Sequence, residues 1–159
     1  MREKLIALLI KHEGCELEAY KDTKGLWTIG IGRCLETKGL TAKECEHLKI
    51  SSTHYIDVLI QRGITHDEAD YLLSNDLDDC MADLTKSLIW FIASPEMVKI
   101  VLVSLCFNLG LAGLLKFKKS LSFIKDGLYF SAATELLDSK WKHDVGDRAY
   151  DLSGMIALA

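Results

Sequence analysis

The spacing of apolar residues changes from the period of a helix to that of a strand in only one stretch of this chain, residues 19–33. There Trp27, Ile29 and Ile31 alternate with small or polar residues, which is the pattern of a strand. The segment Asp22–Gly25 before them is typical of a tight turn, because the aspartate can bond its own backbone and the glycine tolerates positive φ. A β-hairpin is therefore predicted here, and helices must form the rest of the fold.

The other apolar stripes have helical spacing. The longest covers residues 69–84 and follows a capping box, in which the side chains of Thr65 and Glu68 each accept the other's backbone N–H. A first, shorter helix is predicted with Glu13 in its last turn, because Gly14 suits the position after a helix C-terminus. With strands confined to one early region, the predicted fold class is α+β, mostly α.

Further helix starts are predicted where capping residues occur. Ser94 precedes a proline, which is favoured at the first position of a helix. That helix contains an apolar run at residues 100–115, which is too short for a membrane span and is interrupted by Gly110, so a buried core helix is expected. The other candidate caps are Ser120, Ser131 and Asp144.

Charge and cysteine content argue against several kinds of site. The chain has 19 lysines and arginines against 23 aspartates and glutamates, a net charge of -4, which disfavours nucleic-acid binding. No two of the five cysteines form a C-x-x-C pair, and no H-E-x-x-H motif is present. We therefore expect no disulfide framework, no metal site and no cofactor.

The candidate chemistry lies in the hairpin and at the end of the helix before it. Glycoside hydrolysis needs one carboxyl group that donates a proton and one that stays ionised. Glu13 stands at the negative end of a helix dipole, which favours the protonated acid, whereas Asp22 stands in a turn with free backbone N–H groups. The competing interpretation is a solvated helix end and an ordinary turn aspartate.

Thr28 and two glycines share one face of the returning strand. A glycine such as Gly30 inside a strand indicates the close approach of a ligand or of another part of the backbone. We therefore expect this face to be open to something that lies on it, while the apolar face packs inward.

The order of these residues is specific. Glu13, Asp22 and Thr28 follow the spacing E-x₈-D-x₅-T, and the run continues as T-I-G-I-G. This pattern resembles the catalytic hairpin of the phage-type lysozymes, the endolysins of glycoside hydrolase family 24. Similarity to the family continues along almost the whole chain, at Ile64–Ala69, Ser104–Gly110, Ser139–Trp141 and Asp147–Ala149.

The resemblance implies a single lysozyme-like domain with two lobes around a cleft. The small β-hairpin sheet would lie in an N-terminal lobe of about residues 12–64. A helical C-terminal lobe would combine about residues 1–11 with residues 65–159, and a long helix starting near residue 65 would join the two.

The resemblance also implies the catalytic roles. Glu13 would be the general acid that protonates the glycosidic oxygen. Asp22 would orient or activate water, or stabilise positive charge at the anomeric carbon, and Thr28 would help to position the water. The reaction would invert the configuration of the sugar.

Other site residues follow from the same resemblance. Arg148 would pair with Glu13, and Gly30 would support the hairpin; the alternative for Arg148 is an exposed helix arginine. Phe107 and Ser120 would contact sugar, although Phe107 could equally belong to the core and Ser120 could be only a helix cap.

Some positions depart from the family. Arg33 stands where the family usually has histidine and is expected to pair with Asp76, the alternative being that it points to solvent. Cys34 and Glu135 replace residues that contact sugar in close relatives. Five lysines could form a local basic face, or only a solvated helical surface: Lys116, Lys118, Lys119, Lys140 and Lys142.

The expected function is that of an endolysin, a muramidase that hydrolyses the β-1,4 bond between N-acetylmuramic acid and N-acetylglucosamine in bacterial peptidoglycan. The alternatives are a lytic transglycosylase, which would use Glu13 and the substrate's own hydroxyl, and a non-catalytic glycan-binding relative. The protein is expected to be a monomer without stable membrane insertion. It would stay in the host cytoplasm until a separate holin gives access to the cell wall in the periplasm, where lysis releases the phage.

Overall fold

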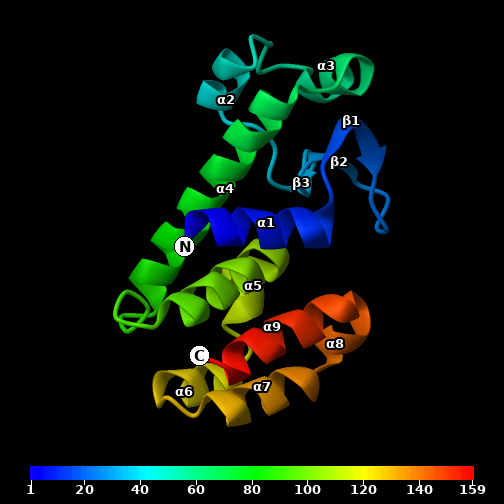
Figure 1. Ribbon diagram of the computed structural model, residues 1–159. Helices are drawn as coiled ribbons and strands as arrows, with labels where there is room; N and C mark the ends of the chain where they lie inside the picture. Colours follow the sequence, from blue (N-terminus) through cyan, green and yellow to red (C-terminus); the bar gives the residue numbers. More distant parts are fainter. The chain divides into compact units, whose positions relative to one another are not determined.

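The structure, a computed structural model, describes residues 1–159 and consists of helices with one small sheet (Figure 1). The sheet is confined to the early part of the chain, which confirms the predicted α+β, mostly α, class. In chain order the elements are α1 (Arg2–Glu13), β1 (Glu16–Lys21), β2 (Trp27–Gly30), β3 (Arg33–Cys34), α2 (Ala42–His47), α3 (Tyr55–Arg62), α4 (His66–Ser87), α5 (Glu96–Leu114), α6 (Lys118–Lys125), α7 (Tyr129–Leu137), α8 (Lys140–Val145) and α9 (Asp147–Ala157).

Two compact units divide the chain. The N-terminal unit is Ile6–Asp76, and the C-terminal unit combines Met1–Leu5 with Leu77–Ala159. Both boundaries fall inside helices, so α1 and α4 contribute residues to each unit. The lobes expected from the sequence, about 12–64 and 1–11 with 65–159, stay a prediction.

The sheet of the N-terminal unit is antiparallel, with the strand order β1-β2-β3. β1 and β2 form the predicted hairpin with Tyr20 opposite Thr28, and β2 turns back into β3 with Thr28 opposite Cys34. β1 starts at Glu16, earlier than predicted, and its pairing is irregular between Glu16 and Tyr20. The alternation at Trp27, Ile29 and Ile31 belongs to the returning strand, so it carried no signal for the start of β1.

The outer edge of β1 is covered by the segment between α3 and α4. The backbone N–H of Ile64 donates to the carbonyl of Leu17 over 2.8 Å. Gly63 lies directly on that edge, because a β-carbon built on it would stand 2.5 Å from the Leu17 carbonyl oxygen, and its φ is 67°. Only glycine suits this position.

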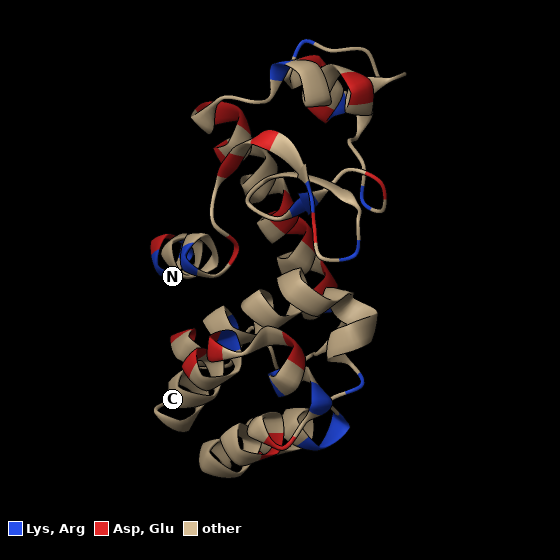
Figure 2. Ribbon diagram, turned by 90° about the vertical axis from the view of Figure 1, so that its right-hand side faces the viewer, with Lys and Arg blue, Asp and Glu red and all other residues tan.

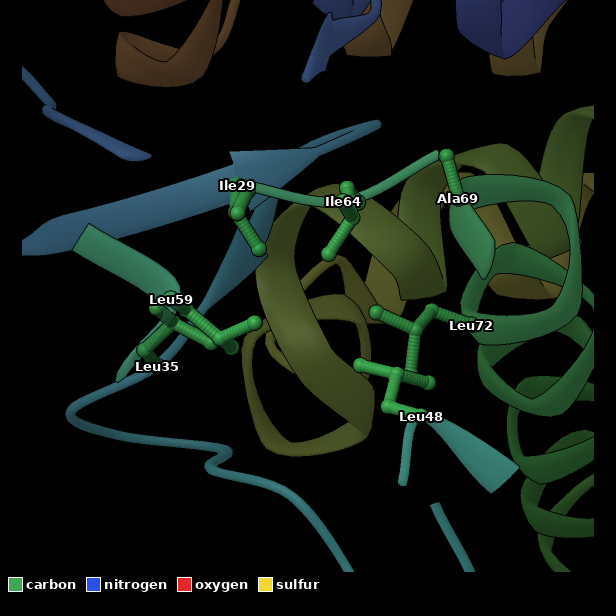
Figure 3. Packing of buried hydrophobic residues seen from close by; sticks show 7 residues of the cluster. All are labelled: Ile29, Leu35, Leu48, Leu59, Ile64, Ala69 and Leu72. Atoms are coloured by element: carbon green, nitrogen blue, oxygen red, sulfur yellow. The ribbon is translucent and has the colours of Figure 1, made fainter. Parts of the chain in front are cut away.

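The hydrophobic core of the N-terminal unit joins the hairpin to the start of α4. Figure 3 shows its buried apolar side chains pointing toward one another from strand, loop and helix segments: Ile29, Leu35, Leu48, Leu59, Ile64, Ala69 and Leu72. Full burial of each large aliphatic side chain stabilises the fold by roughly 1.5–3 kcal/mol. This packing fixes the hairpin, and with it every candidate residue that the hairpin carries.

α4 starts with the predicted capping box. The Glu68 N–H donates to Thr65 Oγ1 over 3.2 Å, and the Thr65 N–H donates to Glu68 Oε2 over 2.8 Å. The helix has 22 residues and is the longest in the protein, as expected. α2 starts with a second capping box, formed by Thr41 and Glu44, which the sequence analysis did not identify.

α5 carries the apolar run that was predicted to be a core helix. Its residues from Ile100 to Cys106 are at most 3% exposed. Gly110 has φ 68° and ψ 163° and interrupts the helix, as predicted, before a last turn that ends at Leu114. The helix is long and apolar enough to cross a membrane, but half of its most apolar window is buried inside the protein, as in a core helix.

Four of the predicted helix starts are wrong. α5 begins at Glu96, with Pro95 as the residue before its first turn, and the Ser94 hydroxyl bonds the carbonyl of Trp90. Three further candidate caps lie inside α6, α7 and α8: Ser120, Ser131 and Asp144. None of these three helices has a side-chain cap at its own start. Burial of one face, rather than capping, determines where such short helices begin.

Candidate active site

Glu13 is the last residue of α1 and is half-buried. The helix ends there because Gly14 has φ 74°, and the Gly14 N–H donates to the carbonyl of Ile10 over 2.9 Å. The carboxyl group lies against the β2–β3 turn: a β-carbon built on Gly32 would stand 3.1 Å from Glu13 Oε2. Since Gly32 also has φ 72°, a larger residue there would be strained and would crowd the carboxyl group.

Asp22 begins the turn between β1 and β2. Its N–H donates to the carbonyl of Leu26 over 2.9 Å. Its Oδ1 accepts the backbone N–H groups of Lys24 at 2.8 Å and of Leu26 at 2.9 Å. The turn therefore fixes the side chain, as predicted, and places two N–H donors where they stabilise a carboxylate.

Thr28 lies in the middle strand and is 4% exposed. Its Oγ1 donates to the carbonyl of Leu26 over 3.2 Å. This bond uses the only proton of the hydroxyl, so the oxygen is left as an acceptor. A water molecule held by Thr28 would therefore have to donate to it.

Tyr20, opposite Thr28 on β1, is a neighbour of the candidate carboxylates that the sequence analysis missed. Burial raises the pKa of its phenol, and the negative charges of Glu13, Glu16 and Asp22 raise this pKa further. Tyr20 is therefore exposed to the negative charge of both Glu13 and Asp22. The strand register was the available signal, since facing residues on paired strands share one face of the sheet.

Gly30 does not leave the strand face open, contrary to expectation. A β-carbon on Gly30 would stand 3.2 Å from Ile64 Cδ1 and 3.7 Å from Ala69 Cβ. The close approach that this glycine permits is therefore to the start of α4 and not to a ligand. Gly30 supports the candidate site by letting the hairpin pack on that helix.

Arg33 follows the turn between β2 and β3 and is 3% exposed. Its Nε donates to Asp76 Oδ2 over 3.0 Å, and its Nη2 lies 3.0 Å from Asp76 Oδ1. The predicted pair is confirmed, with one hydrogen bond to Oδ2 and an ion-pair contact to Oδ1. The alternative, in which Arg33 points to solvent, is wrong.

A second carboxylate, Glu44, completes what we call the Arg33 cluster: Arg33, Lys38, Glu44, Asn75 and Asp76. Arg33 Nη2 donates to Glu44 Oε1 over 2.6 Å, and its Nη1 donates to Glu44 Oε2 over 3.2 Å. Burial acts to raise the pKa of Glu44, but hydrogen bonds from Thr41 and Asn75 and the charge of Arg33 outweigh it, so this pKa is lowered. Each charged side chain of the cluster forms an ion pair with another member of the cluster.

Comparison with known proteins identifies the family. Residues 10–157 match the phage lysozyme family model. The chain is 30% identical over 149 residues to the probable T4-type lysozyme 1 of Dictyostelium discoideum, a match that covers 86% of this chain and 84% of that protein. The probable T4-type lysozyme 2 of the same organism is 31% identical over 144 residues, with the same two shares covered. This chain belongs to the phage lysozyme family.

A third relative comes from a phage. The pre-baseplate central spike protein Gp5 of Enterobacteria phage T4 is 26% identical over 147 residues, which cover 89% of this chain and 25% of that protein. Family membership makes the chain a lysozyme, a glycoside hydrolase whose substrate is peptidoglycan. The resemblance drawn from the hairpin is thereby confirmed.

The C-terminal unit of this lysozyme holds the remaining predicted site residues. Phe107 is half-buried near the end of α5, Ser120 lies in the first turn of α6 and Arg148 in the first turn of α9. Ser120 is 2% exposed and Arg148 is 7% exposed. Their association with Glu13 and Asp22 stays a prediction. No three histidine, cysteine, aspartate or glutamate side chains lie together in a way that could hold a metal ion.

Proposed function

We propose that this lysozyme hydrolyses the β-1,4 bond between N-acetylmuramic acid and N-acetylglucosamine, with Glu13 as the general acid. The observation that supports this best is the position of Glu13 at the carboxyl end of α1, against the glycine turn of the hairpin. The proton of the Glu13 carboxyl group goes to the glycosidic oxygen as the bond to the anomeric carbon breaks, which makes the departing sugar a neutral alcohol.

Asp22 and Thr28 are proposed to act on the water side of the sugar. Two backbone N–H groups hold the Asp22 carboxylate, which can then accept a proton from water or stabilise positive charge at the anomeric carbon. Thr28 accepts a hydrogen bond from the same water, because its own proton is directed to Leu26. Attack from the face opposite to Glu13 gives the expected inversion.

Binding roles in the C-terminal unit belong to the same proposal. Arg148, which is 7% exposed, keeps the supporting role that the family resemblance implies. Phe107 is only half-buried, which leaves part of its ring for contact with sugar. Ser120 supplies a hydroxyl in the first turn of α6.

The biological role that we propose is host-cell lysis by a monomeric endolysin. It would stay in the host cytoplasm until a separate holin opens the way to the cell wall in the periplasm. The match to the phage lysozyme family supports this role. The relatives from Dictyostelium and the central spike protein of phage T4 show that similar sequences also occur outside endolysins. Expression in a bacterial host should cause lysis only together with a holin.

The central test is Glu13→Gln, which keeps the shape of the side chain and removes the proton. Clearing of bacterial cell walls should fall by roughly 10²–10⁴-fold, with thermal stability retained. Glu18→Gln is the matched control, because Glu18 is an exposed glutamate on β1, and it should clear walls at the wild-type rate. Near wild-type clearing by folded Glu13→Gln would refute the assignment.

Product analysis separates hydrolysis from the transglycosylase alternative. Hydrolysis leaves a reducing end, whereas a transglycosylase leaves a 1,6-anhydro end and does not need Asp22. Asp22→Asn and Thr28→Ala should each lower kcat more than they change KM. Full activity of Asp22→Asn with anhydro products would replace hydrolysis by transglycosylation.

A further inference from the structure

The turn that joins α4 to α5 carries the most exposed large apolar side chain of the protein (Figure 1). Ile89 is 91% exposed, and Ile92, three residues later, is 57% exposed. Trp90 between them is half-buried, Ala93 is exposed, and residues 87–95 include no charged side chain. We call Ile89, Trp90, Ile92 and Ala93 the apolar tip. Single exposed apolar residues are normal on a protein surface, whereas several together on one turn mark an interaction site.

Two buried neighbours hold the apolar tip in its exposed position. Leu88 and Phe91 are buried, and each directly precedes one of the exposed isoleucines. The Phe91 N–H donates to the carbonyl of Leu88 over 2.8 Å, and the Ser94 N–H donates to the carbonyl of Phe91 over 3.1 Å. The isoleucines can therefore turn inward only if these bonds break and Phe91 leaves the core.

Charges beside the apolar tip are balanced. Glu96, at the start of α5, accepts a hydrogen bond from Lys4 over 2.9 Å and lies 3.6 Å from the N-terminal amine of Met1. On the other side of the tip, near the end of α4, Asp83 and Lys86 are both exposed and have opposite signs. Basic residues gather elsewhere in this unit, since Figure 2 shows several blue segments where α5 leads into α6. Hydrophobic contact, rather than charge, must therefore attract a partner to the tip.

The geometry of the apolar tip favours a lipid bilayer over a protein as its partner. A side chain as exposed as Ile89 projects from the surface and does not line a groove. A protein that bound this projection would need a matching pocket, whereas the acyl chains of a bilayer are fluid and adapt to it. Tryptophan is favoured at the boundary between membrane and water, where its ring meets the acyl chains and its N–H stays near water.

We propose that the apolar tip binds the surface of a lipid bilayer, with Ile89 and Ile92 among the acyl chains and the Trp90 indole at the level of the headgroups. The contact is shallow and reversible, because two aliphatic side chains enter and α5 stays in the core of its unit. The inference is independent of the proposed hydrolysis, since no residue of the tip belongs to the candidate active site.

Vesicle binding by a matched pair of double variants tests the position of the contact. Ile89→Asp with Ile92→Asp should lower the partition of the protein onto phosphatidylcholine vesicles at least about tenfold, because transfer of these side chains from water supplies the attraction. Leu128→Asp with Phe130→Asp is the control: it adds the same charge at two other exposed apolar residues of the same unit. The control should bind as the wild type does, and equal losses in the two variants would overturn the proposal.

Lipid charge and salt test the driving force. The wild type should bind vesicles of phosphatidylcholine alone about as well as vesicles that also contain phosphatidylglycerol, and added salt should not weaken the binding, because salt screens charges and not hydrophobic contacts. Binding that needs the anionic lipid and disappears at high salt would assign the attraction to surface lysines and overturn the proposal.

The depth of the tip is measured on the unaltered fold. Lipids brominated on their acyl chains close to the headgroup should quench tryptophan fluorescence of the wild type, and Trp90→Phe should lose this quenching although Trp27 and Trp141 remain. Absent quenching in the wild type would overturn the proposal, as would a wild-type dimer that Ile89→Asp with Ile92→Asp converts to a monomer. Both double variants should keep the melting temperature and the rate of wall clearing, so failure of the proposed hydrolysis would be seen separately.

Discussion

The Arg33 cluster gathers cations, and so does a groove of the C-terminal unit that we call the lysine groove, lined by Lys116, Lys118, Lys119 and Lys140. The two regions differ in what surrounds those cations. In the cluster one guanidinium is buried and donates to two carboxylates and to the carbonyl of Gly39. In the groove Lys118 and Lys119 are exposed, at a helix start that no side chain caps. The first region neutralises its charge with its own residues, and the second leaves positive charge in excess.

The difference follows from the cost of burying a charge. A buried ion costs several kcal/mol unless it is paired, so Arg33 could be buried only together with its carboxylates. An exposed lysine costs little, so the groove can keep an excess of positive charge. Removal of the cations should therefore destabilise the cluster and leave the stability of the groove region unharmed.

The largest expected effect comes from Arg33→Met. It leaves the carboxylates of Glu44 and Asp76 buried without their main partner, which should lower the free energy of unfolding by about 3–5 kcal/mol. Urea unfolding at neutral pH measures it. Lys38→Met is the control, because Lys38 also pairs with Asp76 but its side chain is 40% exposed, and its loss should cost at most about 1 kcal/mol. Equal losses for the two variants would contradict the contrast between buried and exposed charge.

Next in size is the coupling between Arg33 and Asp76. A double-mutant cycle of Arg33→Ala and Asp76→Ala, followed by thermal unfolding, should give an interaction free energy of about 1–3 kcal/mol, as for residues within one buried network. Strict additivity of the two substitutions would show that the pair is not energetically linked.

A smaller effect should appear in acid. The pKa of Glu44 is lowered from its ordinary value of 4.5 in the folded protein, so the unfolded chain binds more protons in this range and stability rises with pH. The contribution is fully present above the unfolded pKa and is lost as pH falls through the lower, folded pKa. Glu44→Gln should make the loss of unfolding free energy between neutral pH and pH 3 less steep. An unchanged slope would argue against a charged Glu44 in the cluster.

The smallest effect, of opposite sign, is expected in the groove. Lys118→Gln with Lys119→Gln removes repulsion between two cations and the positive end of α6, so the free energy of unfolding should rise by up to about 1 kcal/mol at low salt. The exposed contact of Lys119 with Glu135 offsets little of this gain. Thermal unfolding at low and high salt measures the change, which salt should diminish. A clear loss of stability would mean that these lysines stabilise the fold.

Sequence patterns predicted the structure correctly where an interaction joins residues that are adjacent in the chain. The Thr65–Glu68 capping box, the glycine that ends α1 and the Asp22 turn each depend on a few adjacent residues, and the structure has all three. The Arg33–Asp76 pair is far apart in sequence and was predicted only from the family resemblance. Glu44, the second carboxylate of the Arg33 cluster, stands three residues after Thr41. This is the spacing of a capping box, which the sequence prediction did not use.

Other features had no local signal. Ser120, Ser131 and Asp144 are common capping residues, but tertiary packing places them inside short helices. α3 was not predicted: it follows His54 in a left-handed conformation, with no side-chain cap at its start. The contact of Glu13 with Gly32 depends on how α1 meets the hairpin, which no spacing along the chain determines.

The covered edge of β1 has a consequence for behaviour at high protein concentration. A strand with unpaired N–H and C=O groups is a template on which a second molecule can add its own strand, and this is a route to aggregation. Here Ile64 already occupies the Leu17 carbonyl, and this contact depends on the absence of a side chain at Gly63. The opposite edge, β3, is only two residues long. The sheet that carries the candidate catalytic residues therefore offers neighbouring molecules little free edge, which keeps it from seeding fibres.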